Sequence, residues 1–311
     1  MVKRKFVVPR RLALLLSVST LALSATTPGT AAPAWQALPP DVSALDAVWN
    51  RTDSLVAAHT VTRSWFWGPP ETAWTTRELY VDDPTGTRSR LVRYYDKSRM
   101  EINNPNGNRN DPFYVTNGLL TVELISGRVQ VGNNTFESRY PANIVVAGDF
   151  NDPAAPTYVS LASKANAGTD HPDPDRQGQQ ATDTIARDGT VGNDPSKAGI
   201  PGTRIVSYDT VTRHNIPQAM WDFLNAQGLV RRGNQTVTEP LSNPWYYATG
   251  RPISDAYWAK VKIGGVPTDT LIQAYERRVL TYTPSNPAGF QVEMGNIGAH
   301  YRDWRYFGMG K

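Results

Sequence analysis

The chain has 311 residues, a formal net charge of +4 and no cysteine. The lack of cysteine excludes disulfide bonds and the cysteine-borne lipid anchor of a bacterial lipoprotein, and with only four histidines it argues against a transition-metal enzyme. The 24 prolines, 24 glycines and 31 aromatic residues indicate a turn-rich fold of short strands.

Residues 1–34 have the pattern of an export signal. Five basic residues precede an apolar run at 12–23, which is shorter than the ~20 residues of a membrane span, and small residues follow. The pair Arg10-Arg11 leaves a twin-arginine route open beside the general one. Removal of this segment, which has five basic residues and no acid, lowers the charge from +4 to −1. We therefore expect a secreted or cell-surface protein without a nucleic-acid partner or a membrane span.

Residues 35–148 read as a tether, a helix and a series of strands. A capping-box pattern and an apolar face predict a helix over 43–51. An Asn-rich loop at 103–110 separates two groups of strands. Because asparagine prefers turns, we expect its side chains to stabilise local turns. The strands are expected at 63–68, 79–81, 88–102, 113–115, 119–124, 128–131, 135–138 and 144–146.

Residues 149–214 match no other part of the chain. Their first part, up to residue 202, is dense in Asp, Asn, Pro, Gly and Thr, so we expect a loop-rich insert. In the following unit, 215–311, Asn215 is a natural N-cap, Pro217 suits the first helical position, and Gly228 follows the end, which predicts a helix over 217–227.

An internal duplication relates the segments around residues 91–118 and 271–298. Tyr275-Glu276-Arg277 repeats Tyr95-Asp96-Lys97, and later matches keep the offset between 177 and 180 residues. The copies extend over roughly 45–120 and 217–298. The sequence thus predicts a strand-rich α+β protein, in which two diverged helix-plus-antiparallel-strand repeat units, 35–148 and 215–311, flank the insert. Because the pairs Asp96-Lys97 and Glu276-Arg277 recur, we expect them to be structural ion pairs or strand-surface charges instead of catalytic groups.

The second copy resembles a repeat found in uncharacterised exported proteins of Chloroflexi-type bacteria. The resemblance lies in GRPISDAYW at 250–258 and in the run 271–301, and the copy is more distantly similar to LGFP-type cell-wall repeats. The resemblance implies an exported setting and a repeat architecture, and it carries no catalytic residue with it.

Aromatic side chains beside polar loops favour binding to a cell-wall polymer or another extracellular glycan. Sugar rings stack their C–H faces on such rings, which offer a large contact area at low entropic cost. The alternative is that the rings fill the core of each unit. The candidate ligand-binding residues are Trp67, Trp74, Trp245 and Trp258.

A polymer hydrolase is the second interpretation, with a site between the insert and the second unit. Ser207, Asp209 and His214 lie close in sequence, and a helix N-terminus after His214 would favour a neutral imidazole base. No Gly-x-Ser-x-Gly elbow accompanies them, so enzyme activity is the less favoured reading. The loop 170–175 reads as solvated turns, and no metal or cofactor is expected. A structural spacer without a ligand is the third interpretation.

Overall fold

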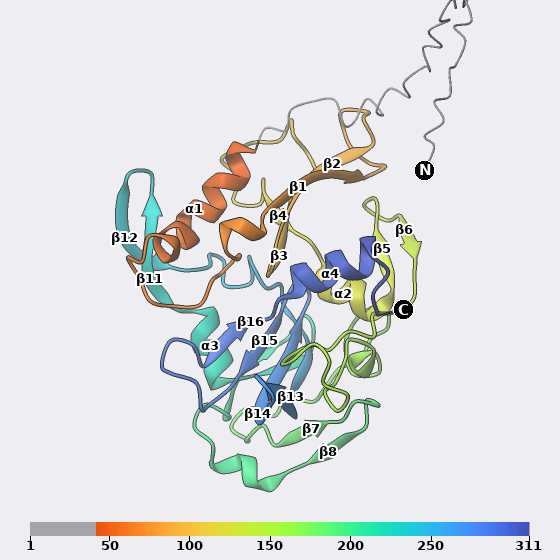
Figure 1. Cartoon of the computed structure of the whole chain (residues 1–311), viewed down its shortest axis with the longest axis vertical. Coiled ribbons are helices and arrows are strands. Elements are labelled where there is room, and N and C mark those ends of the chain that lie inside the picture. Colours follow the sequence, from red (N-terminus) through yellow and green to blue (C-terminus); the bar gives the residue numbers. More distant parts are fainter. Residues whose placement is uncertain (1–41, 311) are drawn as a thin grey trace, which may run out of the picture.

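The computed structural model describes residues 42–310 and shows a strand-rich α+β fold (Figure 1). The predicted export signal and the tether before Val42 lie outside the described residues. Among the helices of residues 42–310, none combines the length and apolar character that crossing a bilayer requires. The α-helices are α1 (Ser43–Ala57), α2 (Leu120–Ser126), α3 (Gln218–Leu224) and α4 (Ile297–Tyr306), and the 3₁₀ turns are η2 (Pro70–Thr72), η3 (Val159–Leu161) and η4 (Pro195–Gly199).

The first sheet has four antiparallel strands in chain order. They are β1 (Trp74–Leu79), β2 (Ser89–Tyr95), β3 (Ser98–Ile102) and β4 (Thr116–Asn117). Tyr95 pairs with Ser98, so the turn between β2 and β3 consists of Asp96 and Lys97. Helix α2 follows β4 directly in the chain.

The second sheet has six strands in the order β16-β15-β14-β13-β7-β8. Strand β7 runs parallel to β13, and the other neighbours are antiparallel, so a hairpin from the predicted insert extends the sheet. Helix α4 follows β16. The strands are β7 (Asp183–Ile185), β8 (Val191–Asn193), β13 (Pro252–Ile263), β14 (Val266–Tyr275), β15 (Val279–Tyr282) and β16 (Val292–Met294).

Three separate hairpins surround the two sheets. The β11–β12 hairpin lies beside α1 (Figure 1). The hairpins are β5 (Arg128–Gln130) with β6 (Phe136–Ser138), β9 (Ile205–Asp209) with β10 (His214–Pro217), and β11 (Gln227–Arg232) with β12 (Gln235–Pro240).

The central strands of both sheets are buried on both faces. Val92 of β2 and Ile272 of β14 belong to one apolar cluster, which includes residues of α2 and α4. Their neighbours Leu91 and Leu271 point to the opposite face and belong to a second cluster, together with Leu45 of α1. Each cluster draws on both sheets, so neither sheet buries its apolar faces alone.

Helices α2 and α4 lie side by side where the two sheets meet, and each contacts the sheet that precedes the other (Figure 1). The amide of Ala299 in α4 donates to the carbonyl of Asp96, at 2.9 Å, in the turn of the first sheet. The amide of Val122 in α2 donates to the carbonyl of Glu276, at 3.4 Å, after β14. The two contacts join the sheets in a reciprocal way.

A buried ion network holds α4 and α2 against the first sheet. Arg99 donates to Glu101 at 2.6 Å and to Glu123 of α2 at 2.8 Å. Arg305 of α4 reaches Glu78 at 2.8 Å. Because every charge has an opposite partner, the network avoids the large cost of an isolated buried ion. Its members are Glu78, Arg90, Arg99, Glu101, Glu123 and Arg305.

Three segments expected as strands have other structures: residues 113–115 form a turn just before β4, and the other two are 63–68 and 119–124. Residues 63–68 form no strand, because the carboxylate of Asp53 in α1 accepts hydrogen bonds from the amides of Phe66, Trp67 and Gly68 at 2.7–3.0 Å. Residues 119–124 belong mostly to α2, which buries Leu120 and Leu124 on one helical face. A short apolar run is compatible with a buried strand or a buried helix, and here the contact with α4 accompanies the helix.

Several predicted boundaries also need correction. The predicted helix over 217–227 spans only Gln218–Leu224, because Asn215 belongs to β10 and Gly228 to β11. The predicted strand over 88–102 is the β2–β3 hairpin, since its turn residues Asp96-Lys97 lack the glycine that marks many tight turns. Residues 144–146 contribute only an isolated bridge, between Val145 and Thr157.

Candidate binding site

The tryptophans Trp67 and Trp258, two of the four expected to bind a glycan, lie in the core. Their exposed fractions are 2% and 1%, so their faces are not accessible to a ligand. The indole Nε1 of Trp258 donates to the carbonyl of Ala181 at 2.8 Å, which satisfies its polar atom within the fold. The expectation is corrected for these two residues, because large rings fill the space between the sheets and the elements packed on them.

The other two expected tryptophans are partly exposed. Trp74 is 37% exposed, and its ring stacks on Tyr94 with centroids 5.5 Å apart. Trp245 is half-buried and makes an edge contact with Tyr246 at 5.4 Å. The chain continues from Trp245 into two tyrosines, Tyr246 and Tyr247, that line a cavity.

The cavity beside these tyrosines has a volume of about 250 Å³, and we call it the Tyr246 pocket. Phe113 on its wall is 43% exposed, and its ring centroid lies 5.8 Å from that of Tyr247. Rings and hydrogen-bonding groups therefore share one small cavity. The lining residues are Phe113, Thr116, Asn117, Val211, Thr212, Tyr246, Tyr247, Arg251, Glu276 and Arg277.

The segment with the two tyrosines is attached to the end of the first sheet. The hydroxyl of Tyr247 donates to the carbonyl of Val115 at 2.7 Å. The side-chain amide of Asn117 donates to the carbonyl of Tyr247 at 3.2 Å. Burial raises the pKa of Tyr247 to about 12, so this hydroxyl keeps its proton at neutral pH. These contacts position the tyrosine before any ligand binds.

Two arginines on the pocket wall are each paired with an acid. Arg277 contacts Glu276 at 3.0 Å, and its Nε donates to the carbonyl of Asn117 at 3.0 Å. Arg251 contacts Asp209 at 2.6 Å and stands over the ring of Tyr246. The expected ion pair between Glu276 and Arg277 is confirmed, and Asp96 and Lys97 form its counterpart at 3.7 Å. The guanidinium groups are thus oriented donors whose charges are compensated.

Gly250 permits the close approach of Glu276 to the chain before β13. Its φ of +73° lies in the left-handed region, and a Cβ there would come within 2.6 Å of the Glu276 Cβ. The Glu276 carboxylate then accepts from the amide of Arg251 at 3.0 Å. Gly68 has the same relation to Asp96, with a φ of +133°. Both glycines are therefore required by backbone conformation and by space.

The expected hydrolase residues do not form a catalytic relay. His214 and Asp209 are opposite each other in the β9–β10 hairpin, but the Asp209 carboxylate contacts Arg251 and nearby backbone amides. The Nδ1 of His214 lies 3.1 Å from Asp173 instead. Ser207 is opposite Ile216 in the hairpin ladder. The geometry of a nucleophile, a base and its orienting acid is therefore not assembled by these three residues.

His214 belongs to a buried polar cluster with Asp173 and Asp255. Burial would lower its pKa, but the hydrogen bonds to Asp173 and Asp255 raise it overall, which is opposite to the direction expected from a helix N-terminus. One imidazole and two carboxylates are donors that a metal ion can use. However, Asp255 already accepts from Arg176 at 2.6 Å and from the amide of Asn215 at 2.7 Å. This donor set fits an ion pair that joins the loop before β7 to β13.

The asparagine loop 103–110 follows the expected turn chemistry. The side chain of Asn104 accepts from the amide of Asn106 at 3.0 Å, and Asn108 does the same for Asn110. Oxygens used in this way stabilise local turns, so the prediction is confirmed.

Phe113, Arg251 and Asn117 are pocket residues that the sequence analysis did not single out for binding. The sequence did give an indication for Phe113, because this residue is matched by Phe290 in the proposed duplication. It gave a second indication for Arg277, because the pair Glu276-Arg277 repeats the pair Asp96-Lys97. No sequence pattern indicates the pocket itself, because its segment 113–117 lies 94 residues (211 − 117) before the next lining residue.

Comparison with known proteins gives no match to a family model, to a curated protein or to a solved structure. The resemblance to exported repeat proteins therefore stays a prediction.

Proposed function

We propose that the protein is an exported glycan-binding protein whose Tyr246 pocket holds a sugar ring of a neutral cell-wall or extracellular polysaccharide. The observation that carries the proposal is the exposed ring of Phe113, 5.8 Å from Tyr247, in a cavity that also contains Arg251 and Arg277. The aromatic ring can contact the apolar C–H face of a sugar, and the oriented arginine donors can bind its hydroxyl groups.

The shape and composition of the pocket support a single sugar ring. Its volume of about 250 Å³ is slightly below the roughly 300–1,000 Å³ of pockets for drug-sized ligands. Phe113 and Tyr246 offer apolar faces to the C–H groups of such a ring. Asn117 and Thr116 are hydrogen-bonding neighbours for its hydroxyls.

The charge balance of the pocket favours a neutral polymer over an anionic one. Arg277 is paired with Glu276 at 3.0 Å, and Arg251 with Asp209 at 2.6 Å. An anionic ligand would compete with these carboxylates for both cations. A neutral ligand can accept hydrogen bonds from the arginines while the ion pairs remain in place.

The proposed architecture is a pair of diverged units around the insert. The meander β1-β2-β3-β4 with α2 has the same order as β13-β14-β15-β16 with α4. Tyr95 ends β2 as Tyr275 ends β14, and the acid–base pairs follow in both turns. The duplication in the sequence and the matching element order support this reading together. The signal-like residues 1–34 support the exported setting.

Retention of the purified protein on insoluble chitin, cellulose and peptidoglycan tests the proposal. We expect Phe113→Ala and Tyr246→Ala each to weaken retention roughly fivefold to tenfold, because a lost ring contact is worth about 1 kcal/mol. Tyr140→Ala is the matched control, since Tyr140 is an exposed ring, 76% accessible, outside the pocket lining. Equal retention of all four proteins, with unchanged melting temperatures, would overturn the assignment to this pocket.

A further inference from the structure

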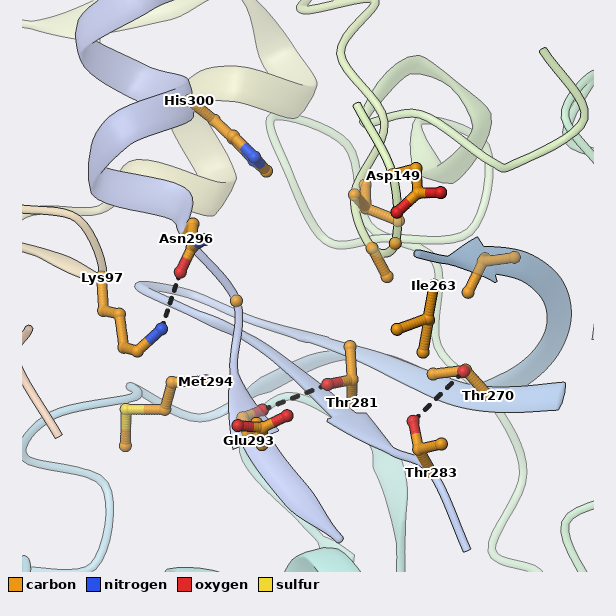
Figure 2. Close-up of a pocket in the computed structure, with 15 residues that line it drawn as sticks. Lys97, Asp149, Ile263, Thr270, Thr281, Thr283, Glu293, Met294, Asn296 and His300 are labelled. Carbon is orange, nitrogen blue, oxygen red and sulfur yellow. Dashed lines mark hydrogen bonds between the residues drawn. The ribbon is translucent and has the colours of Figure 1, made fainter. Parts of the chain in front are cut away.

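A second cavity lies where the turn Asp96-Lys97 meets the end of β16 (Figure 2). Its volume is about 340 Å³, and we call it the Lys97 cavity. Its walls come from β13, β14, β15 and β16, from the start of α4, from the segment 146–149, and from the turn of the first sheet. The polar lining residues used below are Lys97, Thr270, Thr281, Glu293, Asn296 and His300.

The Lys97 cavity and the Tyr246 pocket are built from corresponding parts of the two units. Lys97 and Arg277 have the same place in the turn that follows the acid, and Glu293 corresponds to Thr116 in the last strand. In the Lys97 cavity the first sheet supplies the turn and the second sheet supplies the strand. In the Tyr246 pocket the second sheet supplies the turn and the first sheet the strand.

The contact that closes each site is also repeated. The ammonium of Lys97 donates to the side-chain oxygen of Asn296 at 2.6 Å, just after β16 (Figure 2). The guanidinium of Arg277 donates to the carbonyl of Asn117 at 3.0 Å, at the end of β4. In both sites a cation from one turn reaches the end of the last strand of the other unit. The two cavities are therefore counterparts under the internal duplication.

The floor of the Lys97 cavity is rich in hydroxyl groups. Thr270 and Thr281 lie on one face of the sheet, and Thr283 contacts Thr270 with its hydroxyl at 3.2 Å (Figure 2). Glu293 lies on the next strand, where its carboxylate accepts from the hydroxyl of Ser64 at 2.8 Å. These groups accept and donate hydrogen bonds at short spacing.

The upper wall adds a cation and an imidazole. The ring of His300 projects from α4 toward the cavity (Figure 2), and its Nδ1 lies 3.0 Å from the hydroxyl of Tyr158. Burial and the nearby Lys97 lower the pKa of His300 to about 4, so the imidazole is neutral at physiological pH. A ligand between the walls would meet an ammonium donor, a carboxylate acceptor and hydroxyls. Sugar hydroxyls, which donate and accept, complement all of these.

We propose that the Lys97 cavity is a second sugar subsite, which binds a hydroxyl-rich ring of the same polymer by hydrogen bonds instead of ring stacking. The inference rests on the proposed function, because it extends glycan binding from one pocket to its counterpart. Two subsites on one chain make the second binding event intramolecular, so a polymer is held more tightly than a short sugar.

Two polymer and disaccharide pairs test the inference: chitin with diacetylchitobiose, and cellulose with cellobiose. For the polymer that retains the protein, we expect the matching disaccharide to titrate with a stoichiometry of two. Glu293→Gln and Thr281→Val keep the shape of the cavity and change one polar group each. We expect either one to weaken polymer retention roughly fivefold to tenfold, as Phe113→Ala does, because a lost hydrogen bond is also worth about 1 kcal/mol. Glu293→Gln combined with Phe113→Ala should weaken retention by the product of the two effects, roughly 25-fold to 100-fold.

The outcomes separate the two proposals. A stoichiometry of one, with retention unchanged in both Glu293→Gln and Thr281→Val, would overturn the second subsite and leave the Tyr246 pocket intact. No retention of the unmodified protein on chitin, cellulose or peptidoglycan would overturn both. Melting temperatures that match the unmodified protein ensure that a loss comes from the cavity. Two variants are used so that one can replace the other if it unfolds.

Discussion

Arg277 donates from Nε to the backbone carbonyl of Asn117 at 3.0 Å and so joins the turn after β14 to the end of β4. This bond connects the two sheets across the wall of the Tyr246 pocket, and the paired acid Glu276 contacts the same guanidinium at 3.0 Å. One side chain therefore contributes both to the proposed binding surface and to a contact between the sheets.

Arg277→Lys should weaken glycan retention while keeping the charge. Lysine has no planar fork with which to hold Glu276 and the Asn117 carbonyl together. We expect a severalfold loss of retention and a decrease in unfolding free energy of about 1 kcal/mol, the value of one typical hydrogen bond. Retention assays and urea denaturation measure the two effects. Retention at the original level would show that this guanidinium does not shape the pocket.

Gly250→Ala should destabilise the protein strongly. The residue has a φ of +73°, and an added Cβ would lie 2.6 Å from the Glu276 Cβ. Left-handed backbone costs an alanine roughly 1 kcal/mol, and the clash with a packed side chain adds about 1–3 kcal/mol. Gly264→Ala is the matched control, because Gly264 has a φ of +58° with no atom within 4 Å of an added Cβ. Equal losses of stability in thermal unfolding would contradict the steric argument.

Two buried arginines should respond in opposite ways to replacement by methionine. Arg99 is paired with Glu101 and Glu123 in the ion network, whereas Arg278 donates to the carbonyl of Arg277 and its Nε and Nη2 have no hydrogen-bond partner. Burial, and then the neighbouring Arg277, lower the pKa of Arg278 to about 9.

We expect Arg99→Met to cost about 3–5 kcal/mol, because it leaves buried carboxylates without their cation. We expect Arg278→Met to be neutral or stabilising by about 1–4 kcal/mol, because it removes an uncompensated buried charge. Urea unfolding of both variants measures the difference. A loss of stability in Arg278→Met as large as in Arg99→Met would contradict this account of the core.

His300 should make the folded state sensitive to mild acid. Burial, and then Lys97, lower its pKa from 6.5 to about 4. Below about pH 6.5 the unfolded chain takes up a proton here that the folded chain takes up only near pH 4, so stability decreases across that window. The expected loss is roughly 1–3 kcal/mol between pH 7 and pH 5.

Unfolding of the unmodified protein and of His300→Gln at both pH values measures this contribution. Glutamine does not titrate, so the variant should lose less stability on acidification. His214, whose pKa is raised, contributes in the opposite direction but is present in both proteins and cancels in the difference. An identical loss in the two proteins would show that His300 is not responsible.

The local parts of the fold could be predicted from the sequence, and its long-range assembly could not. The Tyr-acid-base recurrence lies at the ends of β2 and β14, but the expected strand over 88–102 ran through its first copy, because the recurrence does not by itself show a turn. A helix is present where 43–51 predicted one, but it extends to Ala57, and its N-cap is Val42, without the side-chain cap hydrogen bond of a capping box. The sequence does not show that the Asp53 carboxylate binds the backbone at Phe66 in place of a neighbouring strand. In a sequence, an aspartate that binds a loop looks the same as any surface aspartate.

None of the four tryptophans expected to bind a glycan lines the Tyr246 pocket, although the pocket has the aromatic rings that the expectation called for. Aromatic binding was expected, but Trp67 and Trp258 lie in the core, and residue type alone does not tell which rings face inward. The Tyr246 pocket brings Phe113 to Tyr247 across 134 positions of the chain. This contact depends on how the two sheets pack against each other, and a local sequence pattern does not specify that packing.

The most direct test of the account is co-sedimentation of the purified protein with chitin, cellulose and purified cell walls, followed by an assay of the supernatant for released reducing sugar and peptide. The account predicts retention on at least one neutral polysaccharide, without release of product, and weaker retention of Phe113→Ala. Release of product would contradict it in favour of a polymer hydrolase. Absence of retention on every polymer would contradict it in favour of a structural spacer.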